Sequence, residues 1–113
     1  MKVYCKICQL PLSQEVQWYE GQSFGTGDGM PYIQRGWYTM DTPDNEGCIV
    51  INIEDGVNLQ LHTLQSRING CCGLDGLDGL NQLCANGHEV ATERSDCWMT
   101  HQLAFEKEKV LLR

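Results

Sequence analysis

Alternating apolar and polar residues mark the clearest regular structure in the middle of the chain, in the segment GCIVINIEDGVNLQLHTL (residues 47–64). Val57, Leu59 and Leu61 alternate with polar neighbours, a period of two that places one face of a strand against a core and the other toward water. An apolar run precedes them, and the two stretches are separated by Asp55-Gly56, a dipeptide that readily takes the positive φ angles of a tight hairpin turn. The pattern predicts two strands joined at Asp55-Gly56, with the apolar face of the second strand against the core.

Further strands are predicted on both sides of this segment. Residues 13–20 (SQEVQWYE) and 33–40 (IQRGWYTM) carry the aromatic and β-branched residues that strands favour. Alternation near the C-terminus favours a strand that runs through about residue 106, and the last nine residues are equally compatible with one short helix. Trp18, Trp37 and Trp98 are interpreted as core anchors. We therefore expect a β-rich fold, all-β or α+β with little helix, with antiparallel strands in a single small domain that spans residues 1–113.

Length and composition indicate that this domain needs an additional source of stability. A chain of 113 residues with 12 glycines buries a thin core, because its apolar runs are only long enough for strands and small domains bury a modest share of their surface. The seven cysteines are candidates for a cross-link or a bound metal.

The charge of the chain and the pattern of its apolar residues argue against nucleic acids and membranes as partners. The formal net charge is −7, and the eight Lys and Arg residues are scattered, whereas nucleic-acid binding needs clustered basic residues. The first fourteen residues do not resemble a signal peptide, and no apolar run is long enough for a membrane span. We expect a cytoplasmic protein with a protein partner and without nucleic-acid or membrane binding. In that compartment thiols stay reduced and bind metal more often than they form disulfides.

Two stretches of the chain have the spacing of metal ligands. Cys5 and Cys8 form a C-x2-C pair, the spacing with which a tight turn aims two thiolates at one tetrahedral ion. Cys84 and His88 flank Asn86-Gly87, a turn that would fold the chain back and bring Cys84, or both Cys84 and His88, to the same point.

A structural zinc needs four ligands, and the sequence offers more than four. Adjacent residues of an extended chain point to opposite sides, so the neighbouring Cys71 and Cys72 are not expected to bind one ion together. The predicted zinc ligands are Cys5, Cys8, Cys72 and Cys84, with Cys71, Cys97 and His88 as alternates. One site with four of these residues and two sites that share them both remain open. Cys48 is interpreted as a small buried apolar residue.

The segment GCCGLDGLDGLNQLCANGHEVATERSDCW (residues 70–98), together with the early C-x2-C pair, resembles a group of small bacterial zinc-ribbon-like proteins of uncharacterised function. The matching positions cover about a third of the chain and are Cys5, Cys8, Gly70 to Gly76, Cys84, Glu89 to Thr92 and Asp96 to Trp98. The resemblance implies that the cysteines act as one constellation at a zinc-ribbon-like site, and it implies no activity.

Three hypotheses for the function follow. The leading one is a zinc-binding protein in which a structural Zn²⁺ holds together a binding or interaction module. The second is a zinc enzyme with an open coordination position, with three of the four predicted cysteines as ligands and Glu89 or Asp75 as base. The third is a thiol-based redox sensor built on Cys71 and Cys72. Residues 88–92 (HEVAT) begin like the metalloprotease pair H-E-x-x-H, but Thr92 stands where the second histidine is needed.

Overall fold

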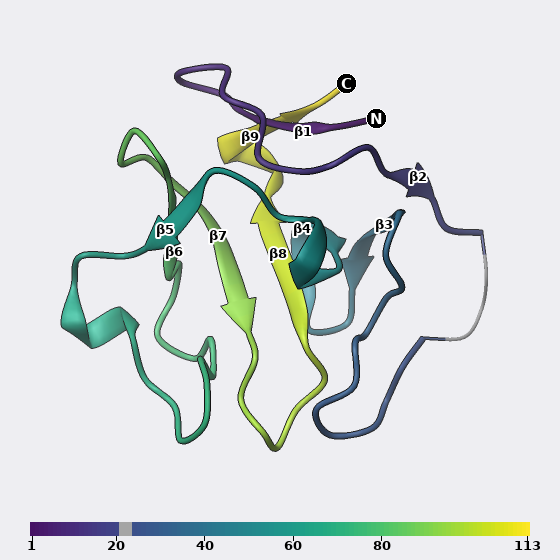
Figure 1. Ribbon diagram of the computed structural model, residues 1–113, viewed down its shortest axis with the longest axis vertical. Coiled ribbons are helices and arrows are strands. Elements are labelled where there is room, and N and C mark those ends of the chain that lie inside the picture. The colour runs from purple at the N-terminus through teal and green to yellow at the C-terminus, as the bar shows by residue number, and fades with distance from the viewer. Residues whose placement is uncertain (21–23) are drawn as a thin grey trace.

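The structure is a computed structural model that describes residues 1–20 and 24–113, and in these residues nine strands form two sheets (Figure 1). Every pair of neighbouring strands is antiparallel except β2 and β3. In spatial order the larger sheet contains β2 (Gln17–Trp18), β3 (Trp37–Thr42), β4 (Asn45–Ile51), β8 (Gln102–Glu106), β7 (Glu89–Arg94), β6 (Gln82–Cys84) and β5 (Leu59–Leu61). The fold is β-rich with antiparallel strands, as the sequence predicts.

The smaller sheet joins the two ends of the chain. Its strands are β1 (Val3–Cys5) and β9 (Val110–Leu112), which lie side by side across one end of the larger sheet (Figure 1). The helical segments in the described residues are three 3₁₀ turns: η1 (Ile53–Asp55), η2 (Gln65–Arg67) and η3 (Lys107–Lys109). Among the described residues no helix has the length and apolar character needed to cross a membrane.

Apolar side chains cover both faces of the larger sheet at its centre. Ile49 and Ile51 of β4 pack with Phe105 of β8 in the main core, whereas Val50 points to the opposite face and packs with Ala104. Because successive side chains of a strand alternate between faces, a strand that is buried on both faces reads as a continuous apolar run, which is what residues 49–51 show.

The predicted hairpin at Asp55-Gly56 is wrong. β4 pairs with β3 and β8, whereas β5 lies at the far edge of the sheet and pairs with β6. Gly56 has a φ of −74°, so no positive φ is needed there. Asp55 is buried, and its carboxylate accepts a 2.8 Å hydrogen bond from the N–H of Gly36. Asp55 therefore ties η1 to the chain that precedes β3.

The expected apolar face of β5 is confirmed at Leu59, which is half-buried and packs against the main core, and is wrong at Leu61, which is exposed. The expected tryptophan anchors are wrong, because the exposed fractions of Trp18, Trp37 and Trp98 are 44%, 37% and 53%. The predicted C-terminal strand is confirmed, because β8 ends at Glu106. The last nine residues contain η3 and β9 rather than one helix.

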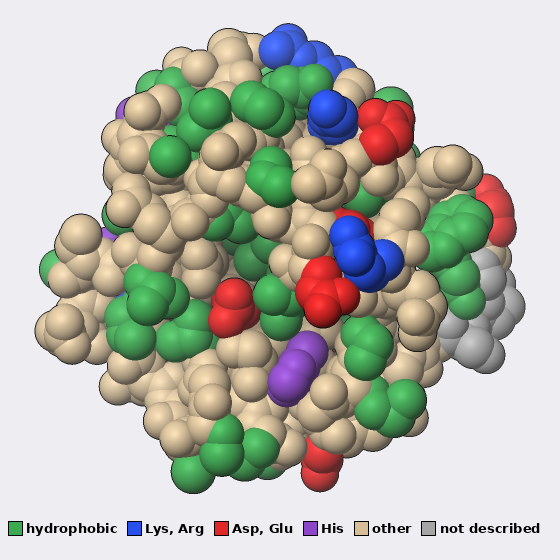
Figure 2. Space-filling model, in the orientation of Figure 1, with side chains coloured by type: hydrophobic (Ala, Val, Ile, Leu, Met, Phe, Trp, Pro, Cys, Tyr) green, Lys and Arg blue, Asp and Glu red, His purple; other side chains and the backbone are tan. Residues whose placement is uncertain are grey.

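Basic side chains are dispersed over the face of the molecule drawn in Figure 2. On the face drawn in Figure 2, Lys and Arg side chains stand apart from one another and form no stripe, and apolar side chains lie in several small patches among polar atoms.

Candidate metal centre

The first part of the candidate metal centre is the turn that follows β1. The N–H of Gln9 donates to the carbonyl of Cys5 at 2.8 Å, and the N–H of Cys5 donates to the carbonyl of Leu10 at 2.9 Å. Gln9 has a φ of +64°, which reverses the chain directly after Cys8. These bonds hold Cys5 and Cys8 on the same side of a closed turn, as the C-x2-C spacing predicts.

The second part is the turn between β6 and β7. The N–H of Gly87 donates to the carbonyl of Cys84, and the N–H of Cys84 donates to the carbonyl of His88, each at 2.8 Å. Gly87 has a φ of +89°, a conformation that glycine adopts without the steric cost of a Cβ atom. The expected Asn86-Gly87 turn is confirmed, and it brings both Cys84 and His88 to the same point.

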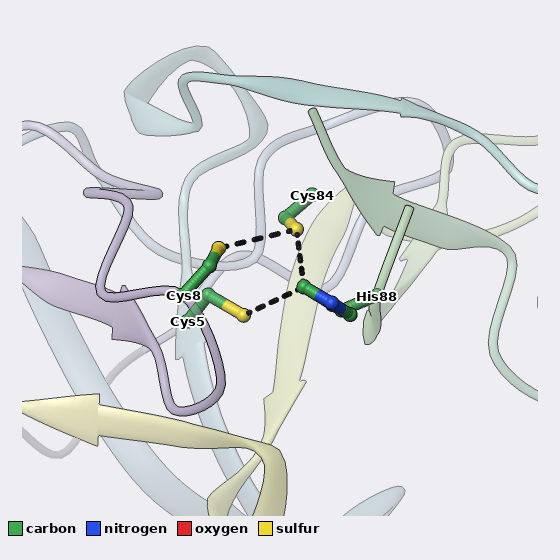
Figure 3. Close-up of side chains that lie close together, drawn as sticks. All are labelled: Cys5, Cys8, Cys84 and His88. Atoms are coloured by element: carbon green, nitrogen blue, oxygen red, sulfur yellow. Dashed lines mark hydrogen bonds between the residues drawn. The ribbon is translucent and has the colours of Figure 1, made fainter. Parts of the chain in front are cut away.

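Four ligand atoms from the two turns converge (Figure 3). The Sγ atoms of Cys5, Cys8 and Cys84 and one ring nitrogen of His88 all lie within 4.8 Å of one another. The Cys8 and Cys84 sulfurs are 3.8 Å apart, and Nδ1 of His88 lies 3.6 Å from the Cys5 sulfur and 3.3 Å from the Cys84 sulfur. Tetrahedral zinc with its usual bond lengths places two sulfurs about 3.8 Å apart and a sulfur and a nitrogen about 3.6 Å apart. These three separations are therefore close to those of a tetrahedral metal site.

Burial and hydrogen bonds have opposite effects on the pKa values of these thiols. Burial raises the pKa of Cys5, which has no exposed surface. A hydrogen bond from the side chain of Asn86, supported by the N–H of Leu10, lowers the pKa of Cys8 to about 6. Because a thiol must lose its proton to bind a metal, the lowered pKa of Cys8 favours its binding of a cation.

The structure corrects the predicted ligand set. Cys5, Cys8 and Cys84 lie together, but the fourth donor beside them is His88 rather than Cys72. Cys72 instead belongs to a second group, which also contains Cys71 and Cys97 and whose three sulfurs lie within 4.8 Å of one another. The expectation that Cys71 and Cys72 point apart is wrong, because it assumed an extended chain and residues 71–73 form a bend.

The second group is organised by Asp96, which sequence reasoning did not select as a functional residue. Its buried carboxylate accepts hydrogen bonds from the backbone N–H groups of Cys71, Cys72 and Cys97 and from Nε1 of Trp98, at 2.8–3.0 Å. The backbone bonds from Cys72 and Cys71 hold the pKa of Asp96 well below its usual range. The sequence signals for Asp96 were its place directly before Cys97 and its match to the resembling proteins at residues 96–98.

The three exposed thiols of the second group affect one another. Hydrogen bonding with the Cys97 and Cys71 sulfurs, together with their charge, raises the pKa of Cys72 to about 12. Three sulfurs this close resist carrying three negative charges unless a cation compensates them.

The remaining candidates lie outside both groups. Cys48 is partly buried against the apolar cluster around Val50, in agreement with its interpretation as an apolar residue. A hydrogen bond with Nε2 of His62, at 2.8 Å, lowers the pKa of Glu89, and Arg67 adds a contact at 3.2 Å. A carboxylate held in this way is a poor general base.

The two groups lie at opposite ends of one strand. His88 directly precedes β7, and residues 95–98 directly follow it, so the six residues of β7 separate the two sets of donors (Figure 1). The cysteines thus form two constellations, each placed to hold a metal ion.

Comparisons with known proteins found no match to this chain. No family model, no curated protein and no solved structure matches the chain.

Proposed function

We propose that Cys5, Cys8, Cys84 and His88 bind a structural zinc ion, and that the domain held by this ion serves as a protein interaction module. The observation that carries the proposal is the convergence of four ligand atoms, from two turns 79 residues apart in sequence (Cys5 to Cys84), at tetrahedral spacing. Three thiolates and one imidazole are a common ligand set for structural zinc.

A structural role is favoured over a catalytic one by the number and burial of the donors. Four protein ligands complete a tetrahedron and leave no position for water or substrate. Cys5 and Cys84 have no exposed surface and belong to the main apolar core. The ion would therefore join the sheet formed by β1 and β9 to the β6–β7 turn from inside the molecule.

Zinc at this point would supply the stability that a thin core lacks. Structural zinc sites contribute roughly 10–16 kcal/mol of apparent binding free energy at neutral pH, compared with about 5–15 kcal/mol for the net stability of a typical domain. Because this free energy is available only to the folded chain, loss of the ion is equivalent to loss of the fold.

The interaction role is supported by the surface above the site. Ile7, at the tip of the first turn, is 70% exposed, and the hollow beside it, about 440 Å³, is lined by residues of both turns and of η3. An exposed apolar side chain beside a hollow offers one anchor for a protein partner. Ile7→Ser should retain the zinc and the fold while it weakens such a partner's binding.

Elemental analysis and unfolding of three proteins test the zinc site. Wild type purified without added metal should carry zinc, Cys84→Ser should lose one equivalent and fail to give a cooperative transition, and Cys48→Ser should match wild type because Cys48 lies outside both groups. Wild type that is folded with less than about a tenth of an equivalent of zinc would show that the core alone holds the domain, contrary to the coupling of zinc binding and folding.

A further inference from the structure

The group of Cys71, Cys72 and Cys97, called the trithiol site below, differs from the four-donor group in the exposure of its ligands. All three cysteines are exposed, whereas Cys5 and Cys84 are buried. The Cys71 and Cys72 sulfurs are 3.8 Å apart, the separation that tetrahedral zinc gives to two thiolates, about 3.8 Å. The sulfurs therefore fit one ion while they face solvent.

The loops that carry these sulfurs are held in place from below. Each oxygen of the Asp96 carboxylate accepts two hydrogen bonds, and the four donors include the backbone N–H groups of all three cysteines. Gly73 lies so close to the second loop that a Cβ atom on it would approach the carbonyl oxygen of Ser95 to 2.3 Å. The two loops thus touch backbone to backbone, and the trithiol site exists before any ligand binds.

The number of donors sets the chemistry. In residues 1–20 and 24–113, the group at this point contains three cysteine sulfurs and no donor atom from another His, Cys, Asp or Glu side chain. Zinc sites with three protein ligands keep their fourth position for water or an external ligand. A divalent cation also offsets the charge of three thiolates above the buried Asp96 carboxylate better than a monovalent cation does.

We propose that Cys71, Cys72 and Cys97 bind a second zinc ion whose fourth coordination position is open to solvent and accepts a small external thiol. Soft thiolate surroundings favour a sulfur ligand over water. The exchange is balanced: the Zn–O bond to water and the S–H bond of the incoming thiol break, a Zn–S bond forms, and the proton passes to solvent. A thiol bound to zinc is held as a thiolate, so the trithiol site presents an activated sulfur nucleophile at the surface.

The neighbouring surface suits an organic ligand of this kind. The indole of Trp98 donates to the same Asp96 carboxylate at 3.0 Å and is nevertheless 53% exposed. Because the indole is held through its N–H group and its ring is exposed, the ring offers an apolar contact to the carbon atoms of a thiol ligand. This feature explains why a large aromatic residue stands in water next to the three sulfurs.

The test counts zinc in wild type and in Cys97→Ser, with Cys48→Ser as the matched cysteine control and Cys72→Ser as a second trithiol variant if Cys97→Ser does not fold. Proteins are kept reduced and purified without added metal. Wild type should hold two equivalents of zinc and Cys97→Ser one, with the same circular dichroism and a cooperative thermal transition at a lower midpoint, because the second ion binds only the folded chain. A fall from one equivalent to none would support the trithiol site and refute the four-donor site, whereas one equivalent in both proteins would overturn the trithiol proposal alone.

The open position is tested with cobalt in place of zinc. The visible absorption bands of Co²⁺ in wild type should shift when 2-mercaptoethanol is added, and those of Cys97→Ser, which retain only the four-donor site, should not. Unchanged wild-type bands would refute the open position. A disulfide among Cys71, Cys72 and Cys97 in the reduced, zinc-supplied protein, seen by mass spectrometry, would replace the metal site by a redox pair.

Discussion

The buried side chain of Asn81, which directly precedes β6, joins this part of the chain to β7, and its replacement tests the fold. The side chain has no exposed surface. Its Oδ1 accepts a hydrogen bond from the N–H of Glu93 at 2.7 Å, and its Nδ2 donates to the carbonyl of Glu93 at 2.9 Å. The pairing of β6 with β7 shifts register one step further on, between Gln82 and Leu83. The amide therefore continues the ladder between the strands at the point where the register changes.

The cost of losing this amide follows from its two bonds. Each bond contributes about 0.5–1.5 kcal/mol, and each buried partner left without a hydrogen bond costs about 1–3 kcal/mol. For Asn81→Ala we expect a loss of about 3 kcal/mol, since water can reach the partly exposed Glu93 and limits the penalty. Asn81→Asp keeps the shape and the acceptor for the Glu93 N–H, but it sets an oxygen against the Glu93 carbonyl and buries a charge, so we expect at least the same loss.

Urea unfolding followed by tryptophan fluorescence measures both variants, with free zinc buffered at one concentration because bound ligand adds to apparent stability. A loss of this size shifts the midpoint by roughly 1–3 M at the m-values of about 1–3 kcal/mol/M that small domains show. Asn69→Ala is the control, because the Asn69 side chain also makes two hydrogen bonds but is exposed, and it should change stability by less than about 0.5 kcal/mol. If Asn81→Asp is as stable as wild type, the amide does not act through its hydrogen-bond pattern.

Three further outcomes are expected. Removal of zinc by a strong chelator should abolish the cooperative thermal transition, with full recovery on zinc addition but not on calcium addition; a transition unchanged by chelation would contradict a structural ion. Gly73→Ala should destabilise the fold by about 1–3 kcal/mol, since the added Cβ atom would meet backbone atoms. Gly87 has open space around it, so Gly87→Ala should cost about 1–2 kcal/mol for its left-handed conformation alone. Denaturant midpoints measure both variants, and equal stability of wild type and Gly73→Ala would disprove the close approach of the loops. Cys48 lies outside both groups of cysteines, and its labelling by iodoacetamide in zinc-loaded protein is followed by peptide mass spectrometry. Burial raises its pKa, so its labelling rate should keep rising from about pH 7 to about pH 10, and rapid labelling at neutral pH would contradict this.

Local signals in the sequence predict the parts of the structure that depend on neighbouring residues. β8 is recognised by its apolar positions, and the turn between Cys84 and His88 is recognised by Asn86-Gly87, whose glycine takes the positive φ that the dipeptide favours. The C-x2-C turn after β1 belongs to the same class. In each case the residues that determine the conformation lie within a few positions of one another.

The errors come from partners that lie far along the chain. Asp55-Gly56 has the local signature of a hairpin, but the Asp55 carboxylate is used by Gly36, 19 residues earlier. Cys71 and Cys72 point to one place because the Asp96 carboxylate, 24 to 25 residues later, binds both of their N–H groups. No local pattern reports such contacts. The local Asn86-Gly87 turn made His88 a candidate, but the sequence could not exclude Cys72, because Cys72 is held in the second group by its contact with Asp96.

The pairing of β1 with β9 has a consequence for the order of events on the ribosome. Synthesis makes Cys5 and Cys8 long before Val110–Leu112, the strand that pairs with β1 and aligns Cys5. Closing a loop of this length costs about 4 kcal/mol in chain entropy by the logarithmic scaling, so the pairing forms only together with the core beneath it. A nascent chain therefore leaves Cys5 and Cys8 unaligned until β9 has been made, and a cation that these two thiols capture before Cys84 is made lacks the donors of the β6–β7 turn.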